Sequence, residues 1–269
     1  MIWFVGLITF GLLGYLCITL IIYFNQDSLL YHPTTYPLEE LIESGPNHHL
    51  TIWPNPSSHY LGLLAQGVNN PSAGTVVVFH GNAGSALGRD FYAQALGPLG
   101  YRVLLMEYPG YGAKEGPLGE SSLVAAGIDS FDQCLKDFGA PIYILGESMG
   151  CGVACAVAAQ RSNSIQGLLL ITPWDTLPNL AQQTYPAFPT RWLTRDRYDN
   201  IEHCRQLTIP IGVVMAQHDT IIPNNRTLNL IQSLPPNYRQ WILNAGHNDW
   251  FDHTNATWWQ DIMTFITAQ

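Results

Sequence analysis

One serine between two glycines is the first candidate for chemistry in this chain of 269 residues. Residues 146–150 read Gly-Glu-Ser-Met-Gly, which is the pattern G-x-S-x-G. The β-forming run Ile142–Leu145 precedes the pattern, and a small, alanine-rich segment at 151–160 follows it. A strand, a sharp turn and a helix in that order would expose the Ser148 hydroxyl above a sheet, as in a nucleophile elbow. The sequence therefore predicts Ser148 as a catalytic nucleophile.

A serine nucleophile needs a base, and the base needs an acid that orients it. In hydrolases with this turn, the order along the chain is serine, acid, histidine. Asp219 comes just after the apolar run 211–216, and His247 lies in a loop after a short expected strand at 240–243. Histidine can accept the serine proton and return it to the leaving group, while the aspartate holds the other ring nitrogen. We therefore expect a triad of Ser148, Asp219 and His247.

Other residues compete for the roles of acid and base. Asp175 follows another expected strand, and Asp249 is close in sequence to His247, so both are alternative acids; Asp175 could instead cap a helix beside Thr176. Other histidines could serve as the base, but only the last of them follows Asp219 after a strand, and it falls within an expected helix: His80, His203, His218 and His253.

Two backbone N–H groups are candidates for an oxyanion hole. Met149 would place its N–H at the start of a helix, where it can bind an oxyanion. The second donor in hydrolases of this type comes from the loop after a central strand. Here the apolar run 74–79 leads into His-Gly-Asn-Ala-Gly-Ser at 80–85, so we expect the Asn82 N–H to be that donor. The same loop could also start a helix, with Ser85 as its cap.

Strands and helices that could position these residues alternate along most of the chain. We expect the first two strands to form an antiparallel hairpin. Alternation of strands and helices predicts an α/β fold with a mostly parallel eight-stranded sheet flanked by helices, and catalytic groups at the carboxyl ends of the strands. The expected strands are 49–53, 60–66, 75–79, 102–108, 142–147, 167–172, 209–216 and 240–243, and the expected helices are 86–97, 120–138, 149–160, 224–233 and 252–267.

Several phrases of the sequence carry a resemblance to a known family. The triad order, the elbow and the strand-loop VVVFHGNAGS at 76–85 resemble the α/β-hydrolase superfamily. Further phrases resemble its branch of membrane-anchored, bud-emergence-type serine hydrolases: QDSLLYHP at 26–33, HGNAGS at 80–85, EYPGYG at 107–112, RDRYD at 195–199, QHDTIIP at 217–223 and GHND at 246–249. The resemblance covers nearly the whole chain. It implies an α/β-hydrolase fold and serine-hydrolase chemistry, but it does not fix a substrate.

The N-terminal segment is apolar and long enough to cross a bilayer. Residues 2–24 carry no ionisable side chain apart from Tyr15, Cys17 and Tyr23, and about 20 apolar residues suffice for a span. A cleaved signal peptide is the alternative, although no small-residue cleavage site or basic start supports it. We expect a transmembrane anchor at 1–25, a juxtamembrane linker at 26–47 and the α/β-hydrolase domain at 48–269, which would stay active when cut free near Asp27.

The charged residues of the sequence say little about the orientation of the expected anchor in the membrane. The first Lys or Arg of the chain is Arg89, so the positive-inside rule has little to count. The α-amino group alone favours a cytoplasmic N-terminus and a catalytic domain on the non-cytoplasmic side of a single-pass membrane protein.

The segment 173–205 is expected to form a short lid that contributes to specificity. Its aromatic residues Trp174, Tyr185 and Trp192 are candidates to line an acyl-chain groove near Ser148, although they could equally form the lid's own core. If the lid lines the groove, truncation of Trp192 should weaken the preference for long acyl chains. The nearby Arg191, Arg195 and Arg197 alternate with aspartates, which favours a structural charge network over a site for an acidic headgroup.

Composition limits the remaining function classes. The net charge of −9 and the lack of a basic cluster exclude nucleic acid as a main partner. No Cys/His spacing for zinc and no phosphate-binding loop is present, so neither a metal nor another cofactor is expected. The sequence predicts a membrane-anchored serine hydrolase of carboxylic esters or thioesters, with a lipid-like or small acyl substrate. The alternatives are a serine peptidase of the same superfamily and a non-catalytic scaffold; no oligomeric state is specified.

Overall fold

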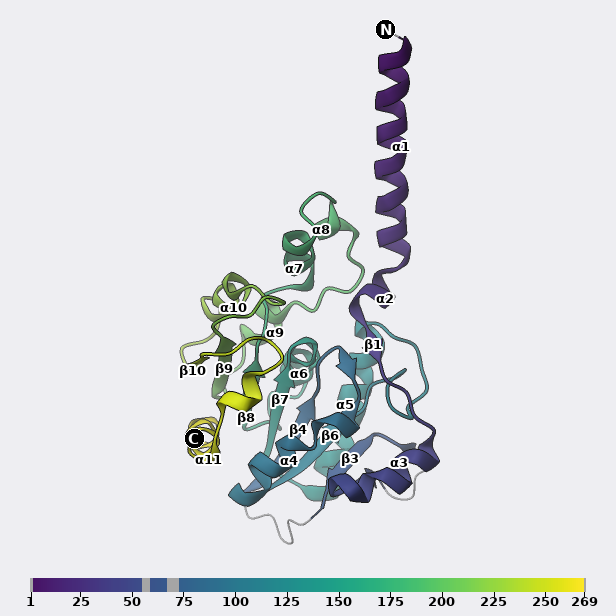
Figure 1. The fold of residues 1–269 in the computed structure, drawn as a ribbon. Coiled ribbons are helices and arrows are strands. Elements are labelled where there is room, and N and C mark those ends of the chain that lie inside the picture. Colours follow the sequence, from purple (N-terminus) through teal and green to yellow (C-terminus); the bar gives the residue numbers. More distant parts are fainter. Residues whose placement is uncertain (1, 55–58, 67–72, 269) are drawn as a thin grey trace.

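An eight-stranded sheet forms the centre of the molecule (Figure 1). The structure, a computed structural model, describes residues 2–54, 59–66 and 73–268. The strand order is β10-β9-β8-β7-β4-β6-β3-β2; β3 pairs antiparallel with β2 and β6, and the other pairs are parallel. The predicted mostly parallel sheet is therefore confirmed. The strands are β2 Leu50–Trp53, β3 Gly62–Ala65, β4 Gly74–Phe79, β6 Tyr101–Met106, β7 Ile142–Glu147, β8 Gly167–Ile171, β9 Ile211–Ala216 and β10 Tyr238–Leu243.

Helices cover both faces of this sheet, because its central strands are apolar on both sides. In β4, Val77 and Phe79 pack into one buried cluster, and Val76 and Val78 pack into the other. Helix α5 (Glu120–Phe138), α6 (Met149–Gln160), α9 (Asn200–Cys204) and α10 (Asn224–Ile231) contribute to the first cluster; α3 (Leu38–Ser44), α4 (Phe91–Leu96) and α11 (Ala256–Ile266) contribute to the second.

Two helix starts differ from the sequence-based expectation. The helix expected at 86–97 is divided into a 3₁₀ turn at Ala86–Arg89 and α4. The terminal helix starts at Ala256 rather than near 252, because the Asn255 side chain accepts a hydrogen bond from the Trp258 N–H and caps it there. His253 consequently lies in a separate 3₁₀ turn, Trp250–His253, and not inside the helix.

The interval 26–47, expected to be a linker, is folded onto the domain. It contains α2 (Gln26–Leu30), β1 (His32–Pro33) and α3. Strand β1 pairs in parallel with β5 (Ala83–Gly84) to form a separate two-stranded sheet. This pairing fastens the chain that follows the anchor to the loop after β4, so the N-terminal segment is fixed close to the expected site.

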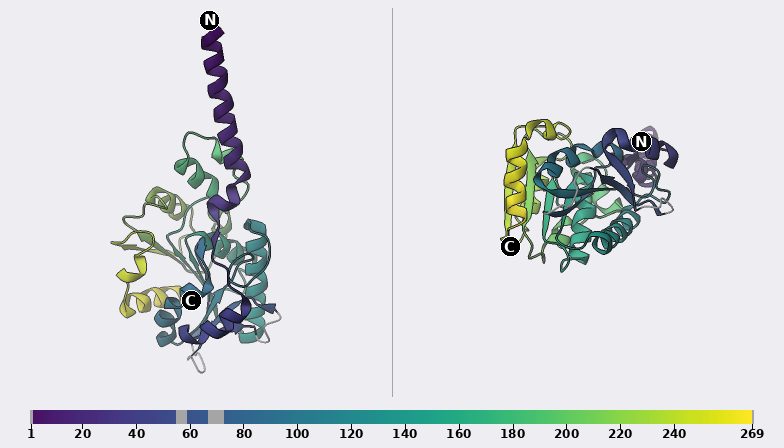
Figure 2. Two further views of the ribbon diagram at one scale, coloured as in Figure 1. Left: turned by 45° about the vertical axis from the view of Figure 1, so that its right-hand side comes forward. Right: turned by 90° about the horizontal axis from the view of Figure 1, so that it is seen from below.

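Helix α1 (Ile2–Phe24) projects away from the domain as a single long rod (Figures 1 and 2). Its residues Trp3–Phe24 have a mean hydropathy of 2.4 and are almost entirely exposed, so the helix is long and apolar enough to cross a membrane. The lid helices α7 (Leu177–Thr184) and α8 (Thr190–Leu193) lie beside the lower part of α1. The lid and the N-terminal helix therefore meet on the same side of the domain.

Candidate active site

Ser148 occupies a strained turn between β7 and α6. Its backbone has φ 52° and ψ −118°, a left-handed region that a non-glycine residue rarely adopts. The flanking glycines allow this turn because a Cβ on Gly146 would lie 2.7 Å from Cys151 Cα, and a Cβ on Gly150 would overlap the carbonyl oxygen of Phe79 in β4. Strand and helix thus approach closely enough to present Ser148 at the carboxyl end of the sheet.

His247 links Ser148 to Asp219 through its two ring nitrogens. Nε2 lies 2.9 Å from Ser148 Oγ, and Nδ1 lies 2.7 Å from Asp219 Oδ2. Asp219 is held in turn, since its Oδ1 accepts hydrogen bonds from the N–H groups of Ile221 (2.9 Å) and Ile222 (2.7 Å). An ionised carboxylate only accepts, so Nδ1 carries the proton and Nε2 is left to accept from the serine hydroxyl. The geometry allows proton transfer from Ser148 to the imidazole.

The alternative acids have other partners. Asp175 follows β8, is buried, and forms an ion pair with Arg226 Nη1 at 2.9 Å. Its carboxylate also accepts from the side-chain amides of Asn179 and Asn229, each at 3.2 Å, so it joins the lid to α10. Asp249 accepts a 2.6 Å hydrogen bond from the Gly246 N–H. Asp175 and Asp249 therefore stabilise neighbouring loops and helices, whereas Asp219 is the carboxylate that contacts the His247 ring.

Asn82, Ser148 and Met149 line the same pocket. The Asn82 carbonyl accepts from the Tyr111 hydroxyl at 2.8 Å and from the His32 N–H at 2.9 Å, and its side-chain amide donates to the Leu30 carbonyl at 2.8 Å. The rest of Asn82 is thereby fixed. Met149 is the first residue of α6, where backbone N–H groups have no intrahelical acceptor. Both N–H groups are suited to an oxyanion.

A buried histidine–glutamate pair supports the loop that carries Asn82. His80 Nε2 lies 3.1 Å from Glu107 Oε1, and Glu107 also accepts from the Ala86 N–H at 3.2 Å. Burial lowers the pKa of Lys114, whose ammonium donates to the Glu107 carbonyl at 3.1 Å, to about 8. Sequence reasoning missed this support. The sequence feature that could have revealed it is Glu107, a glutamate directly after an apolar strand and three residues before the glycine-rich run 110–112.

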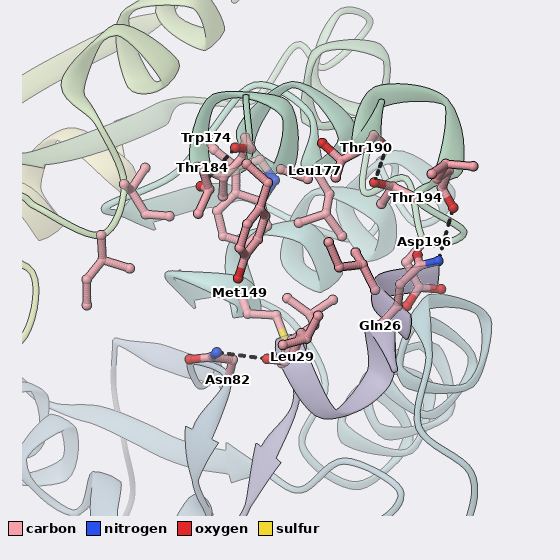
Figure 3. A pocket seen from close by; sticks show the side chains of 18 of the residues that line it. Gln26, Leu29, Asn82, Met149, Trp174, Leu177, Thr184, Thr190, Thr194 and Asp196 are labelled. Carbon is pink, nitrogen blue, oxygen red and sulfur yellow. Dashed lines mark hydrogen bonds between the residues drawn. The ribbon is translucent and has the colours of Figure 1, made fainter. Parts of the chain in front are cut away.

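A mainly apolar pocket of about 230 Å³, which Ser148 helps to line, lies between the lid and the N-terminal segment (Figure 3). Figure 3 shows Trp174 and Leu177 across the pocket from Gln26 and Leu29. The lining residues come from α1 and α2 (Ile22, Gln26, Leu29, Leu30), from the site (Asn82, Ser148, Met149), from the lid (Trp174, Leu177, Leu180, Ala181, Thr184, Tyr185, Thr190, Leu193, Thr194, Asp196) and from the loop after Asp219 (Ile221, Ile222).

The predicted lid aromatics separate into two groups. Trp174, 2% exposed, and Tyr185, 38% exposed, both line the pocket. Trp192 does not line it and is 81% exposed, which differs from the expectation. The reason is that α8 is a single turn in which Thr190 and Leu193 face the pocket, and Trp192 between them is directed elsewhere.

The N-terminal segment is bonded to the lid at several points. Gln26 Nε2 donates to the Leu193 carbonyl at 3.0 Å, and Gln26 Oε1 accepts from the Arg195 N–H at 2.9 Å. Arg195 also forms an ion pair with Asp27 at 2.7 Å. Arg195 therefore belongs to a structural charge network. Within residues 2–54, 59–66 and 73–268, no group of three or more His, Cys, Asp or Glu side chains could hold a metal ion.

Comparisons with known proteins agree with this architecture. The sequence profile of the alpha/beta hydrolase fold family matches residues 74–204. An uncharacterized protein of Mycobacterium tuberculosis (strain CDC 1551 / Oshkosh) is 30% identical over 234 residues, which cover 85% of this chain and 82% of that protein. The lysophosphatidylserine lipase ABHD12 of Macaca fascicularis is 26% identical over 220 residues, covering 74% of this chain and 55% of the lipase. The chain thus spans little more than half the length of that relative.

Solved structures with the same fold include an esterase of Pyrococcus furiosus, with a TM-score of 0.65 at 14% identity over 88% of this chain and 97% of the esterase. An alpha-beta hydrolase from Vibrio vulnificus superposes with a TM-score of 0.63 at 20% identity over 76% of each chain. The fold, the nucleophile elbow and these relatives together identify the superfamily of this protein. This chain belongs to the α/β-hydrolase superfamily and is a hydrolase of that superfamily.

Proposed function

We propose that this protein is a membrane-anchored serine hydrolase that cleaves carboxylic esters or thioesters through an acyl-Ser148 intermediate. The observation that carries the proposal is the unbroken hydrogen-bonded series Asp219–His247–Ser148, whose serine lines an apolar pocket. The name of the lysophosphatidylserine lipase among its relatives supports an ester of a lipid as the substrate.

The reaction follows from this arrangement. Ser148 Oγ attacks the acyl carbonyl carbon while its proton passes to His247 Nε2, and Asp219 stabilises the imidazolium. The Asn82 and Met149 N–H groups donate to the developing oxyanion. His247 then gives the proton to the leaving alcohol or thiol, which departs from the acyl-enzyme. A water molecule loses a proton to His247 and attacks the acyl carbonyl. The bond from the acyl carbon to Ser148 Oγ then breaks, His247 returns the proton to Oγ, and the carboxylic acid leaves.

The pocket favours an acyl substrate over a peptide. Its lining is mainly aliphatic and aromatic, and Asp196, its one acidic member, already accepts from the Tyr31 hydroxyl at 2.6 Å and the Glu120 N–H at 3.1 Å. A peptidase that recognises a free N-terminus needs an available carboxylate. Each buried methylene of an acyl chain contributes about 0.8 kcal/mol, so turnover should increase with chain length until the pocket is filled.

A matched ester and peptide series tests the proposal. The full-length protein in detergent should hydrolyse acyl esters of increasing chain length with rising kcat/KM, and Ser148→Ala should reduce turnover at least about a thousandfold while the fold is kept. Aminoacyl amides cleaved faster than every ester would replace this proposal with a peptidase. Unchanged ester turnover in Ser148→Ala would remove the acyl-enzyme route.

Membrane anchoring by α1 is part of the same proposal, with the catalytic domain on the non-cytoplasmic side. The support is the exposed apolar length of Trp3–Phe24. Protease added to the outside of intact cells should digest the domain, and complete protection of the domain would reverse this orientation.

A further inference from the structure

The lid touches α1 far from the domain surface. The Tyr15 hydroxyl donates to the Ala187 carbonyl at 3.0 Å, and its ring stacks on Phe188 with centroids 5.4 Å apart and planes inclined by 12°. Phe24 is nine positions beyond Tyr15, which is about 13 Å along a helix that rises roughly 1.5 Å per residue. The lid tip, residues 185–193, therefore extends along the domain-side half of the apolar helix, from Leu193 beside Gln26 to Ala187 and Phe188 beside Tyr15.

This position places the lid tip at the depth of a bilayer. The hydrocarbon core is about 30 Å thick, and a helix of 20 residues crosses it. If α1 spans the membrane up to Phe24, the Tyr15–Ala187 contact lies below the headgroup level of the leaflet next to the domain. The charged pair Arg195–Asp27, just beyond the span, then lies at the level of the headgroups.

The chemistry of the lid tip suits this surrounding. Trp192 is 81% exposed in the protein, and tryptophan is favoured where a bilayer meets water. Arg191 is the one charged residue of 185–193, and its long side chain can extend toward lipid phosphates. The exposed apolar residues of the tip thus have a bilayer as a matching partner.

Backbone hydrogen bonding in the lid tip points the same way. Polar backbone groups in lipid must be satisfied within the protein. Pro186 and Pro189 have no N–H, and the Gln182 amide donates to the Phe188 carbonyl at 3.0 Å. Backbone N–H groups that donate within the lid are those of Tyr185, Phe188, Thr190, Arg191, Trp192 and Leu193, which leaves Ala187 as the one N–H of residues 185–193 without a protein acceptor among the described residues.

The pocket above Ser148 extends to this boundary. Ile22 of α1 and Gln26 of α2 form one wall, and Thr190 and Leu193 of the lid lie among the residues that complete it. A chain that leaves the catalytic serine between these walls reaches the side of α1 at the membrane surface. The anchor is therefore also part of the pocket.

We infer that α1 has two roles: it holds the protein in the membrane, and with the inserted lid tip it forms a passage through which the acyl chain of a bilayer-resident lipid ester enters the pocket sideways from the membrane. This inference rests on the proposed esterase function and adds the source and route of the substrate. Water-soluble esters need no such passage.

Two neighbouring residues of α1 provide a matched test. Ile22 lines the pocket, whereas Ile21 is 55% exposed and does not line it. In full-length protein reconstituted in phosphatidylcholine vesicles, the kcat/KM ratio for a long-chain monoacyl ester over a soluble acetyl ester is measured. Ile22→Trp should lower this ratio at least about tenfold, since two lost methylene contacts already correspond to roughly that factor. Ile21→Trp should keep the wild-type ratio.

Equal ratios in wild type, Ile22→Trp and Ile21→Trp would overturn the passage. If neither ester is hydrolysed by wild type in a Ser148-dependent way, the proposed function itself fails, so the two failures are distinguishable.

Insertion of the lid tip is measured separately. In a Cys17→Ser background, a polarity-sensitive dye is attached to Trp192→Cys and, as a control, to Glu43→Cys, an exposed position on α3. Lipids brominated along their acyl chains should quench the dye at 192 and leave the dye at 43 unquenched. A dye at 192 that remains as water-exposed as the dye at 43 would overturn insertion.

Discussion

Two buried aspartates follow the adjacent strands β8 and β9, and their partners separate their roles. Asp219 faces His247 at 2.7 Å, and Asp175 faces Arg226 at 2.9 Å. From the sequence both were candidate acids, because each follows an apolar run that predicts a strand. Only the path of the loop after β10 decides which carboxylate meets the histidine. That path depends on tertiary packing, which a single sequence does not display.

Matched amide substitutions test this division. Asp219→Asn should reduce kcat about a thousandfold or more with little change in stability, because the neutral amide no longer enforces the required imidazole tautomer. Asp175→Asn should lower the free energy of unfolding by roughly 3 kcal/mol, because Arg226 loses its partner in a largely buried site. Ester turnover and urea unfolding of both variants provide the measurement. A larger catalytic loss for Asp175→Asn would exchange the two roles.

Lys114 gives a prediction for pH. Burial lowers its pKa to about 8, although Glu107 and Asp129 oppose the shift, whereas an unfolded lysine has a pKa of about 10.4. Between these values the unfolded chain binds more protons than the native protein, so this group makes the free energy of unfolding rise with pH. The stability of Lys114→Met relative to wild type should therefore be highest near pH 7 and decline toward pH 10. Urea unfolding at several pH values measures this difference in free energy of unfolding between Lys114→Met and wild type. A difference that stays constant from pH 7 to pH 10 would contradict a lowered pKa of Lys114.

At the scale of elements, the nucleophile elbow depends on how closely α6 approaches β4. A Cβ on Gly150 would overlap the Phe79 carbonyl oxygen and lie 2.6 Å from that of His80, both of them backbone atoms. Gly150→Ala should therefore cost at least about 3 kcal/mol of stability or prevent folding. Gly88→Ala is the control, since a Cβ there meets no atom within 4 Å, and its effect should stay within about 0.5 kcal/mol. Equal unfolding midpoints for the two variants would contradict this packing.

Sequence patterns predicted the strands well because the central strands are continuous apolar runs. Val76, Val77 and Val78 are all buried, so β4 was visible without any tertiary information. Short elements were missed where long-range partners define them. Strand β1 has two residues and forms only because it meets β5, whose paired residues lie 51 positions further along the chain. The turn at Ser148 was predictable because its glycines are a local signal. The contact of His247 with Asp219 was expected from the chain order of such hydrolases, and its catalytic role stays a proposal.

At the scale of the molecule, the sequence separated an anchor, a linker and a catalytic domain that the structure joins. Gln26 and Tyr31 are bonded to the lid residues Leu193 and Asp196, and Ile22 lines the pocket. The partners are more than 160 residues apart, so no local pattern reveals them. Cutting the chain near Asp27 would remove the pocket residues Ile22 and Gln26, and the activity of a domain cut free there stays a prediction.

Fractionation of membranes tests whether the whole chain is membrane-bound. Full-length protein should remain in the membrane pellet after an alkaline carbonate wash and be released by detergent, because α1 exposes about 20 apolar residues. Mass spectrometry of the purified protein should find the N-terminal segment intact. A soluble protein that has lost this segment would instead indicate a cleaved signal peptide.

Covalent trapping of the nucleophile tests the central claim most directly. The full-length protein is treated with a fluorophosphonate, and peptide mapping locates the adduct while residual ester hydrolysis is followed. The account predicts one phosphonyl group per chain, on Ser148, with ester hydrolysis lost in proportion to labelling. In Asp219→Asn, Ser148 should be labelled more slowly than in wild type. Full labelling of Ser148 with undiminished hydrolysis, or loss of activity with the adduct on another residue, would contradict the account.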